Sequence, residues 1–476
     1  MRSRLSLDEA NTPGTRGSIK VNTKATPADD DLSQRAPLPR AAKVATAAVV
    51  SGLVIIWLLI DWEWSTVDDP GQVILLAREI QASGWLNGMV QRSSVLMNGD
   101  IGGGIFRPAA WVYPVLVYQL PVEWAHVVRL VMVLLAIAGP VAFYRRGGAS
   151  PQFTFFALIL MIGASSTLYE GLFLISIQEL GGAAFIGLGL LLPWRSTRIV
   201  AFLLAALFKP PFAWFLVAYG LYLWFQRRKP EAVLSGALGI GVLAVSTLIA
   251  TSSGVTESYP LDPLNPALWN QVAKLIEPMN ALLLVSVVWW AVVSGARLHV
   301  SKETLFFGFA WLAYTAQMLP WGISAYYMGP ISYTFGLLLL SLLDRKITVS
   351  RSKLIVGYSL PILLSAWLIR IPLTWGFTMN SVVNETIDCL APYPGTKTLM
   401  IGNLLYVTSS PEGPIQIEGR LQREFPGWDG LIRHTSNADA FDDPDFVLAI
   451  RGTNPAEIPS AEVVCSGSAV TLYREP

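Results

Sequence analysis

The chain has 476 residues, of which 53% are hydrophobic and only 14% are charged, and its formal net charge is +1. A soluble globular protein carries about 25% charged residues, so most of this chain is expected to lie in a lipid bilayer. The small net charge, with no basic stripe along the chain, argues against a nucleic-acid partner. The composition therefore predicts an α-helical polytopic membrane protein.

The N-terminal segment 1–43 is polar and rich in Pro, Thr, Asp and Arg. Such a segment cannot bury a core, and we predict a disordered tail. It is too long and too mixed in charge for a signal peptide, so the first apolar run, at about 44–60, should remain as a membrane anchor. We assign 44–376 to a transmembrane domain and 377–476 to a soluble C-terminal domain.

An acidic pair, Asp68 and Asp69, follows the first apolar run in the string WSTVDDPGQ. Carboxylates are costly inside lipid, so we place the pair in a long loop that spans 61–108. One interpretation is structural, because Pro70 suits the first turn of a helix that either Asp would cap. The other is catalytic: one carboxylate acts as a general base on an acceptor hydroxyl. The second carboxylate, Asp69, then tunes the first or binds a divalent cation such as Mg²⁺ or Mn²⁺.

The loop ends in GGGIFRPAAWVYP, where Arg107 stands just before an apolar stretch. The planar guanidinium suits a bidentate contact to a phosphate, and the alternative is an interfacial Arg that reaches lipid headgroups. The Gly-rich string GDIGGGIF before it is interpreted as a flexible loop, because it lacks the Lys of a phosphate-binding loop. The stretch 109–120 is a span, a re-entrant hairpin or a helix on the membrane surface.

The remaining apolar runs predict about eleven or twelve spans, and several are shorter than the roughly 20 residues that a straight span needs. Short runs suggest broken helices, or helices that end early at a water-filled cavity. The runs lie at about 126–143, 152–167, 179–193, 199–208, 211–226, 232–251, 279–295, 304–319, 327–343 and 354–371.

Lys and Arg gather before the first span and in alternate loops, which predicts that these face the cytoplasm. The C-terminal domain then lies outside an inner membrane, in the periplasm or its equivalent. The other loops that we expect outside are 61–108, 168–178, 209–210, 252–278 and 320–326.

Lys209 lies at an expected outer turn, in the string LLAALFKPPFAWF. Lys residues are uncommon in loops on the outer side of the membrane, so the presence of Lys209 there calls for an explanation. Neutralising the phosphate of a lipid carrier is one reason, and contact with a lipid headgroup is the alternative.

Two further outer loops carry polar side chains. Glu170, Gln178 and Glu179 flank a short apolar piece and are candidates to bind a metal ion or a sugar. Tyr326 and Tyr327 are candidates for hydrogen bonds to a sugar or a phosphate. The alternative for the two tyrosines is the interfacial aromatic belt of the membrane protein.

The tail reads as a small α/β or mostly β domain, with strand-like runs TLMIGNLLYVT, DFVLAI and AVTLYR. It contains both cysteines of the chain, Cys389 and Cys465. A disulfide between them would require an oxidising compartment and would stabilise the fold by about 4 kcal/mol. Two separate buried thiols are the alternative.

These motifs together resemble those of the GT-C superfamily of integral-membrane glycosyltransferases. The resemblance rests on VDDPGQ after the first span, on the long first loop, on FRPAAWVYPVLVYQLP and on FKPPF between short spans. It covers about residues 44–371 and is nearest to the bacterial branch that uses polyprenyl-phosphate sugars. It implies a GT-C-like fold and a sugar transferred on the outer leaflet with inversion, in a single displacement.

The resemblance also implies roles for individual residues. Asp68 would be the general base, since the first acid of an Asp-Glu pair holds that role in several branches. Asp69 stands where that pair has Glu. Arg107 and Lys209 would contact the donor phosphate, and Glu170 or Glu179 would supply a second polar site.

We therefore expect a membrane glycosyltransferase that moves a sugar from a polyprenyl-phosphate donor to a cell-envelope glycan, glycolipid or protein. An O-antigen ligase or polymerase is an alternative, but its main functional loop is expected late in the chain. A polysaccharide or lipid transporter is another, but its ionisable residues are expected in the middle of spans, often with an internal repeat. The sequence shows no clear repeat.

Overall fold

The fold is taken from a computed structural model of the chain. It describes residues 69–117, 119–120, 122–169, 177–254, 272–273, 275, 278–319, 325–401, 412–434, 443–450 and 462–474. The predicted tail 1–43, the first apolar run and Asp68 lie outside these residues.

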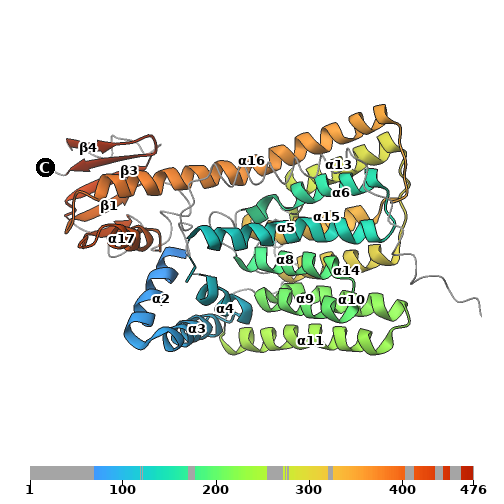
Figure 1. The fold of residues 1–476 in the computed structure, drawn as a ribbon, viewed down its shortest axis with the longest axis horizontal. Coiled ribbons are helices and arrows are strands. Elements are labelled where there is room, and N and C mark those ends of the chain that lie inside the picture. The colour runs from blue at the N-terminus through green and yellow to red at the C-terminus, as the bar shows by residue number, and fades with distance from the viewer. Residues whose placement is uncertain are drawn as a thin grey trace, which may run out of the picture.

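The described chain is a bundle of helices that leads into a small sheet domain, as Figure 1 shows. This confirms the predicted class, a helical membrane protein with a C-terminal α/β domain. The helices of the bundle are α2 (Asp69–Ser83), α3 (Trp85–Gly102), α4 (Pro108–Val117), α5 (Val122–Arg146), α6 (Pro151–Ala164), η1 (Ser166–Tyr169), α8 (Ile177–Leu191), α9 (Arg195–Phe208), η2 (Pro210–Phe212), α10 (Ala213–Phe225), α11 (Lys229–Ser252), α13 (Pro278–Ser294), α14 (Lys302–Met318), α15 (Ala325–Ser341) and α16 (Arg351–Leu390).

Within the described part of the chain, three stretches are long and apolar enough to cross a membrane: Trp124–Arg146, Lys229–Ser252 and Arg351–Arg370. Six shorter apolar helices accompany them among the described residues. One of the six is α4, which fills most of the ambiguous stretch 109–120. Its ten residues rise only about 15 Å, half of the hydrocarbon thickness, so α4 by itself does not span a bilayer.

Glycines set the closest helix contact, between α5 and α8. A methyl group added at Gly139 would overlap the backbone of Gly187, and one added at Gly187 would overlap the carbonyl of Leu135. Beyond this crossing, the guanidinium of Arg146 donates to the carbonyl of Leu190. The two helices therefore run in the same direction and in backbone contact.

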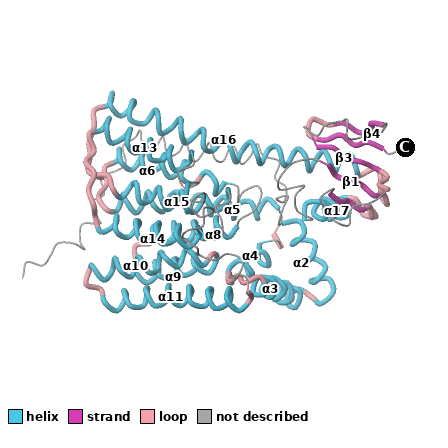
Figure 2. The backbone as a smooth tube through the Cα atoms, turned by 180° about the vertical axis from the view of Figure 1, so that it is seen from behind, coloured by secondary structure: helices cyan, strands magenta, loops and turns pink. Residues whose placement is uncertain are grey.

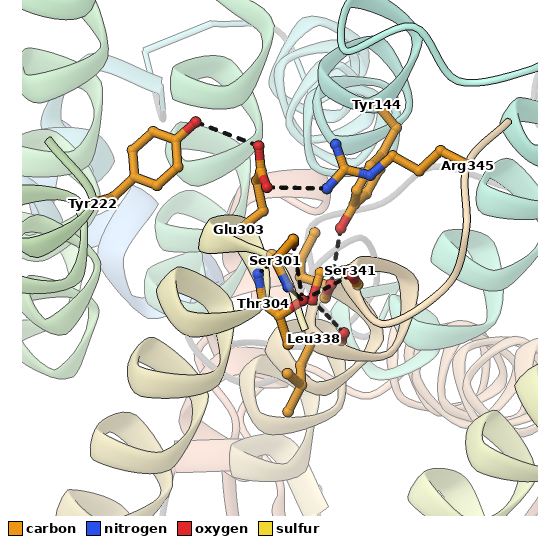
Figure 3. A network of polar contacts seen from close by, with 9 residues as sticks. Tyr144, Tyr222, Ser301, Glu303, Thr304, Leu338, Ser341 and Arg345 are labelled. Carbon is orange, nitrogen blue, oxygen red and sulfur yellow. Dashed lines mark hydrogen bonds and ion pairs between the residues drawn. The ribbon is translucent and has the colours of Figure 1, made fainter. Parts of the chain in front are cut away.

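The basic loops meet at one end of the bundle. The backbone N–H of Ser150 donates to the carbonyl of Arg345 at 2.7 Å, which joins the α5–α6 and α15–α16 loops. Figure 3 shows the guanidinium of Arg345 between the Tyr144 ring, 5.0 Å away, and the carboxylate of Glu303, 3.3 Å away. Tyr222 donates to Glu303 from the end of α10, so this ion pair ties four neighbouring elements together.

The opposite end carries α2, α3, α4 and the sheet domain, as the view from behind in Figure 2 makes clear. Helix α2 contacts α17 (Glu412–Glu424) of the sheet domain, and the guanidinium of Arg78 donates to Gln422 at 3.3 Å. The first loop and the C-terminal domain therefore lie together, at the end away from the basic loops.

The sheet domain has the strand order β2-β1-β3-β5-β4, with β1 parallel to β2 and β3 and the last hairpin antiparallel. The strands are β1 (Lys397–Ile401), β2 (Leu431–His434), β3 (Phe446–Ile450), β4 (Glu462–Ser466) and β5 (Val470–Arg474). The three strand-like runs of the sequence correspond to β1, β3 and β5. The boundary expected at 376–377 falls inside α16, which continues without a break into the domain.

The end of α16 is fastened to the last hairpin at two places. The disulfide between Cys389 and Cys465 is present, with the two Cα atoms 5.7 Å apart, which confirms the prediction. One turn earlier, the carboxylate of Glu385 accepts hydrogen bonds from the backbone N–H groups of Ala469 and Val470, at 2.6 and 3.0 Å. The sheet domain is therefore held to the bundle by the helix that leads into it.

Candidate functional site

The predicted helix after the acidic pair is present. Helix α2 begins at Asp69, with Pro70 in its first turn. Its start belongs to the same end of the bundle as α3, α4 and the sheet domain (Figure 1). The start of α2 at Asp69 is therefore at the same end of the molecule as the other predicted site residues, whereas Asp68 lies outside the described residues.

Arg107 forms a bidentate ion pair with Asp100, a residue that the sequence analysis did not single out. Its Nε and Nη2 atoms lie 2.7 Å from Oδ2 and 2.7 Å from Oδ1 of Asp100. The indole N–H of Trp111 donates to the same Oδ2 at 2.5 Å. The carboxylate thus gathers a guanidinium and an indole from the start of α4.

The Gly-rich string folds the chain back to make this pair. Helix α3 ends at Gly102, and Gly104 adopts a φ of +76°, a left-handed conformation that suits glycine. The N–H of Ile105 then donates to the carbonyl of Asp100 at 2.7 Å, which closes the turn. The predicted loop is therefore an ordered reversal that returns Arg107 to the end of α3.

Lys209 forms a buried ion pair with Glu179. Its ammonium donates to Oε1 of Glu179, and the two side chains are 12% and 5% exposed. Glu179 lies in the first turn of α8, and Lys209 lies between α9 and η2. The attraction between the two side chains offsets part of the cost of burying them.

The glycines after Glu179 allow this approach. A methyl group at Gly181 would meet the Phe208 ring at 2.6 Å, and one at Gly182 would overlap the ring of Phe212. The string QELGG therefore places a carboxylate beside a helix end that larger residues would hold away.

The two ion pairs lie near each other. Helix α4 packs against α9, with the rings of Tyr113, in the middle of α4, and Phe208, at the end of α9, 6.2 Å apart. Arg107 stands directly before α4 and Lys209 directly after α9, so this contact brings the two cations to the same region of the bundle. Two cations, each with its own carboxylate, thus lie at the end of the bundle that carries α4, where an anionic group could bridge them.

Two buried polar residues of α5 escaped the sequence analysis as site candidates. His126 and Arg129 are 1% and 3% exposed. Arg129 lies seven residues before Ala136, hence on the same helix face, and Glu179 lies eight residues before Gly187. Ala136 and Gly187 meet at the α5–α8 crossing. Arg129 on α5 and Glu179 on α8 therefore lie about 10–12 Å from the crossing, in the same direction along the two helices and at the same level of the bundle. The signal was an Arg inside an apolar run, which usually faces a bundle interior.

The other predicted residues are placed less fully. Gln178 precedes Glu179 in the first turn of α8 and is partly buried. Tyr326 and Tyr327 lie in the first turn of α15, with side chains outside the described part. Glu170 lies outside the described residues. The structure thus brings Arg107, Lys209 and Glu179 together and leaves the others as predictions.

No group of three or more His, Cys, Asp or Glu side chains that could hold a metal ion occurs among the described residues. The described part does not include the side chain of Asp69. A divalent cation at Asp69 therefore stays a prediction.

Comparison with known proteins gives one similar solved structure, the crystal structure of ArnT from Cupriavidus metallidurans in the apo state. The sequence identity is 13%, the TM-score is 0.47, and the alignment covers 91% of this chain and 98% of that chain. No family model and no curated protein matches the sequence.

Proposed function

We propose that the protein is a membrane glycosyltransferase that takes a sugar from a polyprenyl-phosphate donor and passes it to a cell-envelope glycan, glycolipid or protein. The observation that carries the proposal is the packing of α4 against α9, which brings together Arg107 and Lys209, 102 residues apart in the sequence and each paired with a carboxylate. Two converging cations at the outer end of a membrane bundle suit a lipid-linked phosphate, which enters from the bilayer.

The reaction is a single displacement at the anomeric carbon. Asp68 takes the proton of the acceptor hydroxyl, the hydroxyl oxygen forms a bond to that carbon, and the bond from the carbon to the phosphate oxygen breaks. The sugar is transferred with inversion, and polyprenyl phosphate leaves. Asp69 tunes Asp68 or holds a divalent cation, and Glu179 with Glu170 lines the sugar side of the site.

The charges suit this chemistry. The donor phosphate is a diester with one negative charge, and it gains a second charge as the bond to the sugar breaks. Arg107 and Lys209 therefore interact more strongly with the departing phosphate than with the donor, which lowers the barrier. In the resting protein, Asp100 and Glu179 compensate the two cations.

The proposed location is the inner membrane, with the N-terminus in the cytoplasm and the sheet domain outside. The basic loops and the sheet domain lie at opposite ends of the bundle, which agrees with cytoplasmic basic loops. The disulfide of the sheet domain suits an oxidising compartment. The reaction would then use donor sugar on the outer leaflet.

The test is a transfer assay with purified protein, a panel of synthetic polyprenyl-phosphate sugars and an envelope extract as acceptor. We expect transfer from at least one donor, and loss of transfer in Asp68→Asn. Asp69→Asn should impair transfer less if its role is to tune Asp68. If both variants transfer sugar as well as the parent, the acidic pair only caps α2 and the mechanism is wrong.

A further inference from the structure

Asp100 occupies an unusual position for a residue near the membrane surface. Its side chain is only 14% exposed, and its two oxygens accept three hydrogen bonds, two from Arg107 and one from Trp111. Each of these donors belongs to the segment that begins α4. The carboxylate is therefore the point that joins the end of α3 to the start of α4.

The contacts around Asp100 fix the orientation of the guanidinium. A bidentate pair holds the plane of an Arg side chain, because both N–H bonds must point at the two carboxylate oxygens. The Trp111 indole is held in turn by the ring of Phe106, edge to face at 6.0 Å. Arg107 is thus held by the carboxylate of Asp100 and by the indole of Trp111, which donates to the same carboxylate.

Charge gives Asp100 a second effect on Arg107. Arg107 precedes α4, which packs against α9 just before Lys209, and two like charges in a partly buried site repel each other. The carboxylate of Asp100 offsets this repulsion on one side, as Glu179 does for Lys209. Without the charge of Asp100, this repulsion would favour a position of Arg107 further from Lys209.

We propose that Asp100 is a positioning residue that holds the guanidinium of Arg107 beside Lys209, so that one donor phosphate contacts both cations. The proposal rests on the proposed function, because it concerns the donor phosphate. Asp100 acts through Arg107 and does not itself contact the donor. The competing explanation is that Asp100 only closes the loop between α3 and α4. The two explanations predict different effects on binding when variants of Asp100 and Arg107 are combined.

The test measures the dissociation constant of a polyprenyl monophosphate for the full-length protein in lipid nanodiscs. The variants are Asp100→Asn, Arg107→Gln, their combination, and Asp100→Glu, which keeps the charge. Glu79→Gln is the matched control, since Glu79 pairs with Arg92 at 3.5 Å in the same loop, between α2 and α3. Thermal unfolding of each variant accompanies the binding measurement.

We expect Asp100→Asn to weaken binding about tenfold, the scale of one lost charged hydrogen bond, and Glu79→Gln to leave it unchanged. The double variant should bind no more weakly than Arg107→Gln alone, because Asp100 acts through Arg107. Asp100→Glu should recover part of the affinity. If the Asp100→Asn protein does not fold, Asp100→Glu still tests the proposal, because its displaced carboxylate should weaken binding without unfolding the protein.

Two results would overturn the inference while leaving the proposed function intact. One is binding by Asp100→Asn that equals that of the parent, while Arg107→Gln binds weakly. The other is a double variant whose loss is the sum of the two single losses, which indicates a general effect on the loop. A parent protein that does not bind the polyprenyl monophosphate at all would instead refute the proposed function.

Discussion

The contact between α5 and α8 leads to a stringent prediction about a single glycine. Replacing Gly187 with Ala adds a methyl group that overlaps the carbonyl of Leu135, and the Cα of Ala136 would lie 2.8 Å from it. Backbone atoms cannot rotate away as a side chain can, so the helices must separate. Because α8 carries Glu179, the separation also shifts the partner of Lys209.

The size of the effect follows from two opposing terms. Overpacking a tight core site costs about 1–3 kcal/mol, and the overlap with backbone atoms places Gly187 in the upper part of that range, at about 2–3 kcal/mol. Ala stabilises a helix relative to Gly by up to about 1 kcal/mol, which offsets part of this cost. We therefore expect Gly187→Ala to lower the free energy of unfolding by about 1–2 kcal/mol.

Gly241 provides the matched control, because it lies within α11 and an added methyl group there meets no atom within 4 Å. Gly241→Ala should keep or raise the stability. The assay is thermal unfolding of the two variants and the parent in one detergent, followed by tryptophan fluorescence. If Gly187→Ala unfolds at or above the temperature of Gly241→Ala, the backbone contact does not limit the packing of α5 on α8.

Three further predictions concern the sheet domain and the cation pair. Burial acts to raise the pKa of Glu385, but hydrogen bonds from Ser468 and from the backbone N–H groups of Ala469 and Val470 together hold the pKa below its ordinary value of 4.5. This stabilisation is present above that value and is lost as the pH falls through the lowered pKa. Glu385→Gln should therefore lower the unfolding temperature at pH 7, and the gap should shrink below about pH 4.5; a constant gap would contradict the prediction. Replacing Cys389 and Cys465 with Ala opens a crosslink over 76 residues and should lower the free energy of unfolding by about 4 kcal/mol. We expect faster proteolysis of the sheet domain, whereas unchanged proteolysis would mean that Glu385 alone holds the hairpin. The third prediction concerns Lys209→Ala combined with Glu179→Gln, a double variant that avoids an unpaired buried carboxylate. It should lower kcat/KM for the donor about 10- to 100-fold. An unchanged value would indicate that Lys209 only contacts a lipid headgroup.

The sequence predicted the class of fold because hydropathy and charge are local signals. The apolar runs after the first, the basic loops between them and the strand-like runs each correspond to observed elements, and the place of Cys389 and Cys465 in one small domain pointed to the disulfide. The shared end of Arg107 and Lys209 followed from the alternation of the loops. Their approach depends on α4 packing against α9, a contact that no local pattern records.

The partners of the two cations were harder to predict, for physical reasons. Asp100 stands in a Gly-rich string whose composition suggested a flexible loop, and only the left-handed turn at Gly104 returns Arg107 to it. Glu179 was a candidate for metal or sugar, but its pairing with Lys209 depends on glycines that let α8 approach the end of α9. Such contacts are decided by tertiary packing, which hydropathy does not encode.

The most direct test of the account is a structure of the protein with a polyprenyl phosphate bound in a lipid bilayer. The measured quantity is the distance from the phosphate oxygens to the guanidinium of Arg107 and to the Nζ of Lys209. We expect hydrogen-bond distances of about 3 Å to both cations, with Asp100 still paired to Arg107. A phosphate bound elsewhere, with Lys209 still paired only to Glu179, would contradict it.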